Sequence, residues 1–207
     1  MISRNREEPT QHPTGCLPPF EGILQVSRPP EVHCFMESIR DGNAMDAKAF
    51  QDYYPPELSY CYGCGRLNEH GHRIRSFWDG DETVAFFTPQ PYHIAIPGYV
   101  YGGLLASLVD CHGTGTAAGA SYRAENRGMD TKPPLRFVTA SLKVDYLRPT
   151  PLGVQLEIRG KVKEVSGRRV TVAVAISAAG DVCVRGEVVA VQMPAGMMPA
   201  SENSGGD

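Results

Sequence analysis

The stretch GYVYGGLLASLVDCHGTG, from Gly98 to Gly115, decides the fold of this 207-residue chain. Apolar side chains recur in it at the three- and four-residue spacing of a helix, at Leu104, Leu105, Leu108 and Val109. The pattern predicts a helix from Gly102 to about Ala120. Asp110 follows directly after the apolar stripe. Because a carboxylate is costly to bury unless a partner or a reaction uses it, Asp110 is a candidate functional residue.

Composition describes an ordinary globular chain. Apolar residues make up 42%, charged residues 21%, and the net charge is −3, which suits one domain. The lack of a basic excess argues against a nucleic-acid partner. No apolar run approaches the roughly 20 residues that cross a membrane, and the N-terminal residues show no apolar signal core. We therefore predict a cytoplasmic protein without a membrane partner, whose six cysteines are reduced thiols.

Four regions are predicted along the chain. Residues 1–19 are polar and proline-bearing, which indicates a disordered N-terminal tail. Residues 20–59 form an N-terminal arm that is expected to be partly helical. Residues 60–193 form the folded domain, and residues 194–207 resemble the first tail in composition.

The folded domain alternates between helix and strand patterns. Six segments rich in valine, isoleucine, threonine and aromatic residues are expected to be strands, at His72–Trp78, Thr83–Phe87, Leu135–Leu147, Val154–Val165, Arg169–Ala178 and Val182–Val191. The breaks between the last four are short, which predicts antiparallel pairing in sequence order. A helix that is apolar around much of its circumference must be buried. The predicted fold class is therefore α+β, with an antiparallel sheet of about six strands around one long central helix.

Three stretches carry a family resemblance. They are CYGCGRLNEHG (Cys61–Gly71), IPGYVYGGLLASLVD (Ile96–Asp110) and TASLKVDYLRPTPLG (Thr139–Gly153). In this order they resemble the hotdog-fold acyl-CoA thioesterases, in the branch that holds the phenylacetate-pathway (PaaI-like) enzymes and mitochondrial acyl-CoA thioesterases. The resemblance covers about Tyr60–Met193. It implies the hotdog fold, hydrolysis of an acyl-CoA thioester to free acid and coenzyme A, and a homodimer or homotetramer.

The resemblance also implies roles for individual residues. Asp110 falls on the family's catalytic carboxylate, and Gly102 on the residue whose backbone N–H forms the oxyanion hole. Thr139 falls on the strand hydroxyl that helps to hold the attacking water. Tyr101 departs from the family, which has a histidine before the two glycines, close to the thioester carbonyl. This departure bears on the rate and the substrate rather than on the fold.

The residue chemistry agrees with these roles. A helix N-terminus presents unpaired N–H groups and a partial positive charge, and glycine lets a carbonyl approach the backbone, which suits Gly102 and Gly103. A carboxylate in an apolar cleft has a raised pKa and can act as general base. Direct attack of Asp110 on the carbonyl, through an anhydride, is the alternative.

The spacing of the two predicted catalytic groups adds a constraint. Eight residues of helix separate Gly102 from Asp110 by about 12 Å along the axis. One small carbonyl cannot touch both, so this chemistry requires a site shared between two chains.

Further residues are candidates for substrate contacts. His93 precedes the helix, where an acyl group would enter, and Tyr99 is one of several aromatic residues suited to shaping an acyl pocket. Arg148 and the basic residues that follow it can meet the phosphates of coenzyme A. The plainer interpretations are a core role for the aromatic residues and a solvated face for the basic ones.

The Cys61-x-x-Cys64 motif raises the question of a metal. Structural zinc takes four ligands, and the spacing of the nearest spare ligands fits no standard site, at Cys34, His70 and His72. We therefore predict no metal, no cofactor apart from the coenzyme A of the substrate, and a turn that packs against the sheet. Cys111 lies next to Asp110 but faces elsewhere, and no adjacent base marks it as a nucleophile.

Two other functions compete with hydrolysis. Hydratases of this fold carry an aspartate and a histidine five positions apart, and the corresponding position after Asp110 is Gly115. A non-catalytic protein that binds acyl-CoA or an acyl carrier is the other alternative, with Tyr101 marking lost activity. Release of thiol from acyl-CoA distinguishes hydrolysis from binding alone.

Overall fold

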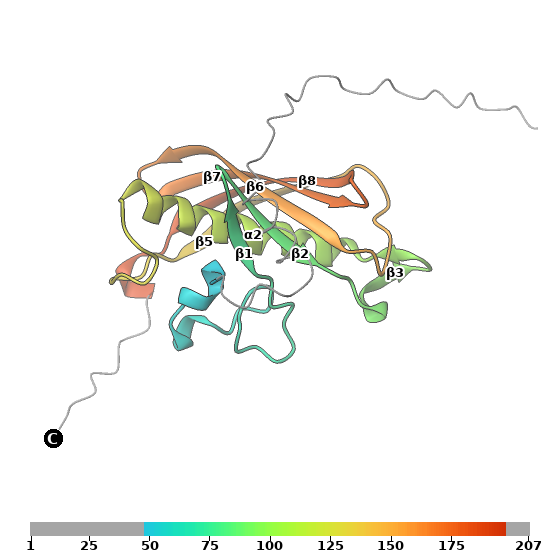
Figure 1. Ribbon diagram of the computed structural model, residues 1–207, viewed down its shortest axis with the longest axis horizontal. Coiled ribbons are helices and arrows are strands. Elements are labelled where there is room, and N and C mark those ends of the chain that lie inside the picture. The colour runs from blue at the N-terminus through green and yellow to red at the C-terminus, as the bar shows by residue number, and fades with distance from the viewer. Residues whose placement is uncertain (1–47, 198–207) are drawn as a thin grey trace, which may run out of the picture.

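A computed structural model describes residues 48–197 of the chain (Figure 1). The predicted N-terminal tail, most of the arm and the last ten residues lie outside the described residues. The elements run in the order η1 (Phe50–Tyr53), η2 (Pro56–Leu58), β1 (Ser76–Asp79), β2 (Glu82–Phe87), η3 (Pro91–His93), β3 (Ile94–Ile96), β4 (Tyr99–Val100), α2 (Gly102–Ala124), β5 (Phe137–Tyr146), β6 (Leu156–Ser166), β7 (Arg169–Ala178), β8 (Asp181–Gln192) and η4 (Ala195–Met197).

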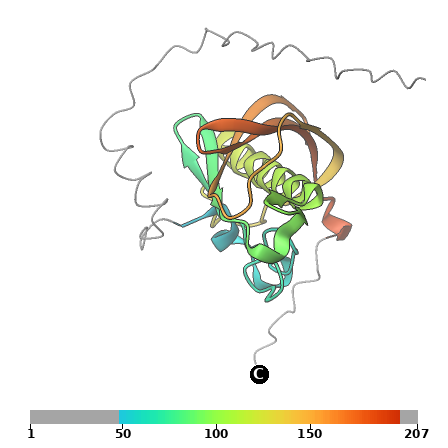
Figure 2. The same cartoon turned by 90° about the vertical axis from the view of Figure 1, so that its right-hand side faces the viewer.

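One sheet wraps around one long helix. The antiparallel sheet has six strands in the order β1-β2-β6-β7-β8-β5. Viewed from its end, α2 lies inside the curve of the sheet (Figure 2). The predicted α+β hotdog arrangement is therefore confirmed. Strands β3 and β4 form a separate small ribbon just before α2.

The predicted pairing in sequence order is wrong at one place. Strands β6, β7 and β8 pair consecutively, but β5 pairs with β8, and β6 pairs with β2. The connection after β5 contains Pro149 and Pro151, whose missing N–H groups cannot join a ladder. It binds the segment before α2 instead, where Val100 N donates to Thr150 O at 2.9 Å and Leu152 N donates to Gly98 O at 2.9 Å. The chain thus crosses the sheet before β6 begins.

Two element ends also differ from the sequence prediction. The first strand begins at Ser76 rather than His72, because Arg73 adopts a positive φ of 51°, which breaks extended structure. Helix α2 continues to Ala124, past the predicted end near Ala120. Within residues 48–197 no helix is long and apolar enough to cross a membrane.

The predicted apolar stripe of α2 is the centre of the core. Its four residues are each at most 3% exposed, at Leu104, Leu105, Leu108 and Val109. Alternate residues of β7 are buried from Val170 onward, as expected for a strand with one face on a core. The helix approaches the sheet closely, because a Cβ added at Gly186 would lie 2.4 Å from Cγ1 of Val109.

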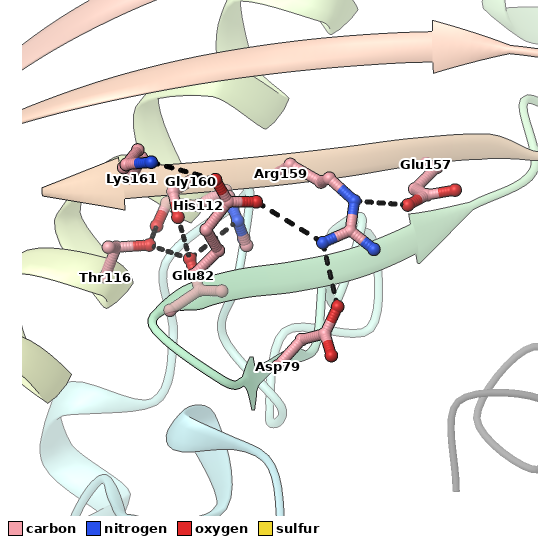
Figure 3. Close-up of polar contacts among 9 residues, drawn as sticks. Asp79, Glu82, His112, Thr116, Glu157, Arg159, Gly160 and Lys161 are labelled. Atoms are coloured by element: carbon pink, nitrogen blue, oxygen red, sulfur yellow. Dashed lines mark hydrogen bonds and ion pairs between the residues drawn. The ribbon is translucent and has the colours of Figure 1, made fainter. Parts of the chain in front are cut away.

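A polar cluster fixes another side of α2 to the sheet. His112 is fully buried, with Nδ1 2.9 Å from Ser76 Oγ and Nε2 3.1 Å from Thr83 Oγ1. Thr83 Oγ1 is also 2.5 Å from Thr116 Oγ1 and donates to Gly160 O (Figure 3). Burial lowers the pKa of His112 to about 4, so its ring is neutral at pH 7. This cluster sets the rotation of α2 and thereby the direction in which Asp110 points.

Candidate active site

One face of α2 is not covered by the sheet. Its residues recur three or four positions apart and are partly exposed, at Gly103, Ser107, Asp110 and Thr114. Apart from Ala106, which is also partly exposed, the residues on the other faces between Gly103 and Thr114 are buried. Asp110 therefore lies at a boundary, with apolar helix packing on one side and an open surface on the other.

The carboxylate of Asp110 has a hydroxyl partner from the edge strand β5. Thr139 donates a hydrogen bond from Oγ1 to Asp110 Oδ1. Burial raises the pKa of Asp110, the bond from Thr139 opposes the rise, and negative charge at Cys61 adds to it. Thr139 itself is exposed. A solvent molecule can thus reach a carboxylate that has a higher affinity for a proton than an ordinary aspartate has.

The N-terminus of α2 presents the other predicted catalytic element. Tyr101 is the N-cap, and Gly102 and Gly103 are the first two helical residues, whose N–H groups have no partner within the helix. The Tyr101 ring lies over Gly103, where an added Cβ would be 2.4 Å from ring atoms. Tyr146 donates from its hydroxyl to the Gly102 carbonyl at 2.8 Å. Glycine at 103 is therefore required for the position of Tyr101.

The unbroken helix keeps these two groups apart. Gly102 and Asp110 both lie in α2, so about 12 Å of helix separates them. The strand next to this face, β5, is a sheet edge and carries exposed apolar side chains at Val138, Leu142 and Tyr146. Within one chain, the Gly102 N–H and the Asp110 carboxylate therefore cannot both contact the carbonyl of one substrate.

A cavity of about 660 Å³ opens beside the N-terminus of α2. It is lined by Tyr101, Gly103, Ser107 and His93, together with aromatic side chains that include Tyr62, His72, Phe87 and Tyr92. The rings of His72 and His93 are 5.4 Å apart. Partial burial lowers the pKa of both histidines, and the nearby His93 lowers the pKa of His72 further, so both rings are neutral at pH 7.

Two of the predicted substrate-binding residues lie elsewhere. Tyr99 belongs to β4, bridges to Pro151 and does not line the cavity. Arg148 is on the surface, where its Nη1 is 2.7 Å from Asp181 Oδ1. The structure thus brings Tyr101, Gly103 and His93 to one cavity, and Asp110 to Thr139.

The sequence interpretation missed several neighbours of the site. Ser107 and Phe87 line the cavity, and Tyr146 contacts the first turn of α2. The sulfur atoms of Cys61, Cys64 and Cys111 all lie within 4.8 Å of one another. Only the C-x-x-C spacing signalled this cluster, because Cys111 is far away in sequence and nothing local marks it.

Comparisons with known proteins identify the family of this chain. Residues 97–190 match the thioesterase superfamily. Over 87 residues the chain is 37% identical to acyl-coenzyme A thioesterase THEM4 of Xenopus laevis. The matched segment covers 42% of this chain and 33% of that protein. The chain spans about a third of the length of the curated relatives it matches.

Solved structures give the same assignment over more of the chain. A thioesterase superfamily protein from Shewanella loihica PV-4 is 48% identical, with a TM-score of 0.52, over 67% of this chain and 97% of that one. Another thioesterase superfamily protein is 25% identical, with a TM-score of 0.53, over 78% of this chain and 81% of that one.

Proposed function

Because this chain belongs to the thioesterase superfamily, we propose that it hydrolyses an acyl-CoA thioester to a free acid and coenzyme A. The observation that carries the proposal is the pairing of Asp110 with the Thr139 hydroxyl on a partly exposed face of α2. Chemistry at this face needs no cofactor apart from the coenzyme A of the substrate. We also propose a cytoplasmic location.

In the proposed reaction Asp110 is the general base. It takes a proton from a water held beside it, and the water oxygen attacks the thioester carbonyl carbon. The Thr139 hydroxyl orients the carboxylate and keeps a lone pair for the water. The resulting oxyanion accepts a hydrogen bond from the Gly102 N–H. The C–S bond then breaks, and the proton on Asp110 passes to the departing thiolate.

Direct attack by Asp110 is the alternative route to the same products. It forms an anhydride between Asp110 and the acyl group, releases coenzyme A, and ends when water cleaves the anhydride. The raised pKa of Asp110 favours proton transfer over this route, because a carboxylate with a higher affinity for a proton is a stronger general base.

We propose that two chains share each site. The helical separation of Gly102 and Asp110 supports this, and so does the open face of α2 beside the exposed apolar edge of β5. A two-fold pair would place Gly102 of one chain opposite Asp110 of the other, twice over. The active unit is then a homodimer, alone or paired into a homotetramer.

The aromatic cavity is the proposed place for the acyl group. It adjoins the N-terminus of α2, so an acyl chain or ring within it would hold the thioester carbonyl near the Gly102 N–H. Tyr101 borders the same cavity and is mostly exposed, so its hydroxyl is available to the substrate. Substrate contacts of Tyr99 and Arg148, outside the cavity, stay proposals.

The proposal is tested by thiol release from a panel of acyl-CoA substrates. We expect Asp110→Asn to lower kcat/KM at least a hundredfold, with the fold retained, because asparagine keeps the shape and loses the base. Asp145→Asn is the matched control, since Asp145 is an exposed aspartate of β5 that pairs with Lys143. Activity in the Asp110→Asn variant above about a tenth of the wild type, a loss under about 1.4 kcal/mol, would refute the base role.

The same panel tests the competing function. Tyr101 in place of the family histidine favours a non-catalytic acyl-CoA binding protein as the second candidate. Tight acyl-CoA binding without thiol release, on every substrate of the panel, would replace hydrolysis by this function.

A further inference from the structure

Three cysteine side chains converge beside α2, outside the proposed reaction. Cys61 and Cys64 come from the loop between η2 and β1, and Cys111 comes from the helix. All three are free thiols, and every pair of their sulfur atoms is within 4.8 Å. Cys64 and Cys111 are buried, whereas Cys61 is exposed.

The spacing of the sulfur atoms suits a tetrahedral metal ion. Zinc–sulfur bonds of about 2.3 Å place the sulfurs of two tetrahedral ligands about 3.8 Å apart. The Sγ atoms of Cys61 and Cys111 are 3.7 Å apart, and the other pairs need to close by no more than about 1 Å to reach this value.

The loop is shaped around the helix thiol. Gly65 N donates to Cys61 O at 2.7 Å, which closes a tight turn over the C-x-x-C segment. A Cβ at Gly63 would lie 2.2 Å from Cys111 Sγ, and a Cβ at Gly65 would lie 2.5 Å from Cys61 N. Both glycines are therefore needed for the loop to hold its two thiols against Cys111.

The three thiols are also suited chemically to a metal. The Sγ atoms of Cys61 and Cys111 are within hydrogen-bond distance of each other. A thiolate is the form that binds a metal. The cluster thus holds three thiols at coordinating distance, and a bound cation would displace their protons.

We propose that Cys61, Cys64 and Cys111 bind one zinc ion, with water at the fourth position beside the exposed Cys61. Thiolate sets select zinc over magnesium or calcium, and three protein ligands with one water is a known zinc arrangement. The ion would link the 61–65 loop to α2 at Cys111, the residue next to Asp110. This inference does not depend on the proposed hydrolysis, and it replaces the prediction of no metal, which considered only ligands near the motif in sequence.

A disulfide is the competing use of these thiols. It would join two sulfurs and leave the third unpaired. The structure instead holds three sulfurs within 4.8 Å of one another, with none of them bonded. A metal uses all three.

Metal content of the full chain tests the proposal. The protein is produced with zinc in the medium, purified without a metal-binding tag, and analysed by plasma mass spectrometry. We expect about one zinc per chain in the wild type, and a loss of at least tenfold in Cys61→Ser and in Cys111→Ser. Cys183→Ser is the matched control, because Cys183 is a buried free cysteine of β8 outside the cluster, and it should keep the zinc.

A second measurement avoids any variant that fails to fold. Zinc in the wild type is exchanged for Co²⁺, and the thiolate-to-cobalt absorption band is recorded. The alkylation of each cysteine in the same sample is then measured by mass spectrometry. The expected result is a strong band, with Cys61, Cys64 and Cys111 protected together. The proposal is overturned if the zinc-loaded wild type is metal-free after dialysis, if Cys61→Ser keeps its zinc, or if intact mass shows a disulfide within the cluster.

Discussion

The packing of α2 against β6 makes Gly160→Ala a sharp test of the fold. An added Cβ would lie 2.6 Å from Thr83 Oγ1, 2.7 Å from Thr116 Oγ1 and 3.0 Å from His112 Nε2. All three atoms belong to buried, hydrogen-bonded side chains. The methyl group therefore has to push Thr83 away from His112 or move the helix.

The expected cost follows from these contacts. Overpacking a core costs about 1–3 kcal/mol, and a buried group that loses its hydrogen bond costs about 1–3 kcal/mol more. We expect Gly160→Ala to lower the free energy of unfolding by about 3 kcal/mol. At a slope of about 1–3 kcal/mol per molar urea, the midpoint falls by about 1–3 M.

Urea unfolding measures this effect at one fixed protein concentration, because chain association adds to stability. Gly102→Ala is the control, since a Cβ there meets Tyr146 at an ordinary 3.4 Å, and its stability should change by less than about 1 kcal/mol. A Gly160→Ala protein within about 1 kcal/mol of the wild type would show that the His112 cluster is not packed as described.

Three further changes test the site by kcat/KM on the best acyl-CoA substrate. Tyr101→Phe should slow the enzyme about three- to tenfold, because it loses a hydroxyl donor, whereas Tyr101→His should be tolerated because the ring keeps a donor. A Phe variant at full rate would show that the hydroxyl has no part in catalysis. Thr139→Val should lower kcat/KM about tenfold or more, because the hydrogen bond to Asp110 is lost, and a Thr139→Ser enzyme should keep most of the wild-type kcat/KM. Equal rates for the Val and Ser variants would contradict this role of the hydroxyl. Gly103→Ala should reduce activity by displacing the Tyr101 ring, which a Cβ would meet at 2.4 Å, and this loss should shrink when Tyr101→Ala is added to it.

Local patterns predicted the elements of this fold well. The apolar spacing that ends at Val109 marked α2, and valine-rich runs marked the strands, because burial on one face imposes these periodicities. The partner of β5 was not predictable in this way. Strand pairing depends on where the proline-bearing connection crosses the sheet, and its bonds to Val100 and Gly98 are contacts between distant segments.

In the candidate site, too, residues marked by a local pattern were predictable, and residues brought together from distant segments were not. Asp110 was recognisable in the sequence because burying a carboxylate beside an apolar stripe is costly. Thr139 was identified from the family resemblance. Cys111 was considered only as a nucleophile, because its two thiol neighbours come from a loop some fifty residues earlier. Arg148 was chosen for its charge alone, and in the structure Asp181 pairs with it.

The central claim is that Asp110 of one chain and the Gly102 N–H of another act on one thioester. Gly102→Pro removes this N–H with little harm to the helix, since proline is favoured at the first helical position. Tyr101 before it is already extended, with φ −62° and ψ 128°, as a residue before proline should be.

The most direct measurement mixes Asp110→Asn chains with Gly102→Pro chains in equal amounts, after each has been shown to be folded and inactive alone. In a mixed dimer one site inherits both defects and the other inherits neither, and half of the dimers are mixed after random exchange. Thiol release should therefore return to about a quarter of the wild-type rate. If subunit exchange is confirmed by mass and the mixture stays inactive, Asp110 and Gly102 do not meet across two chains, and the shared-site account is wrong.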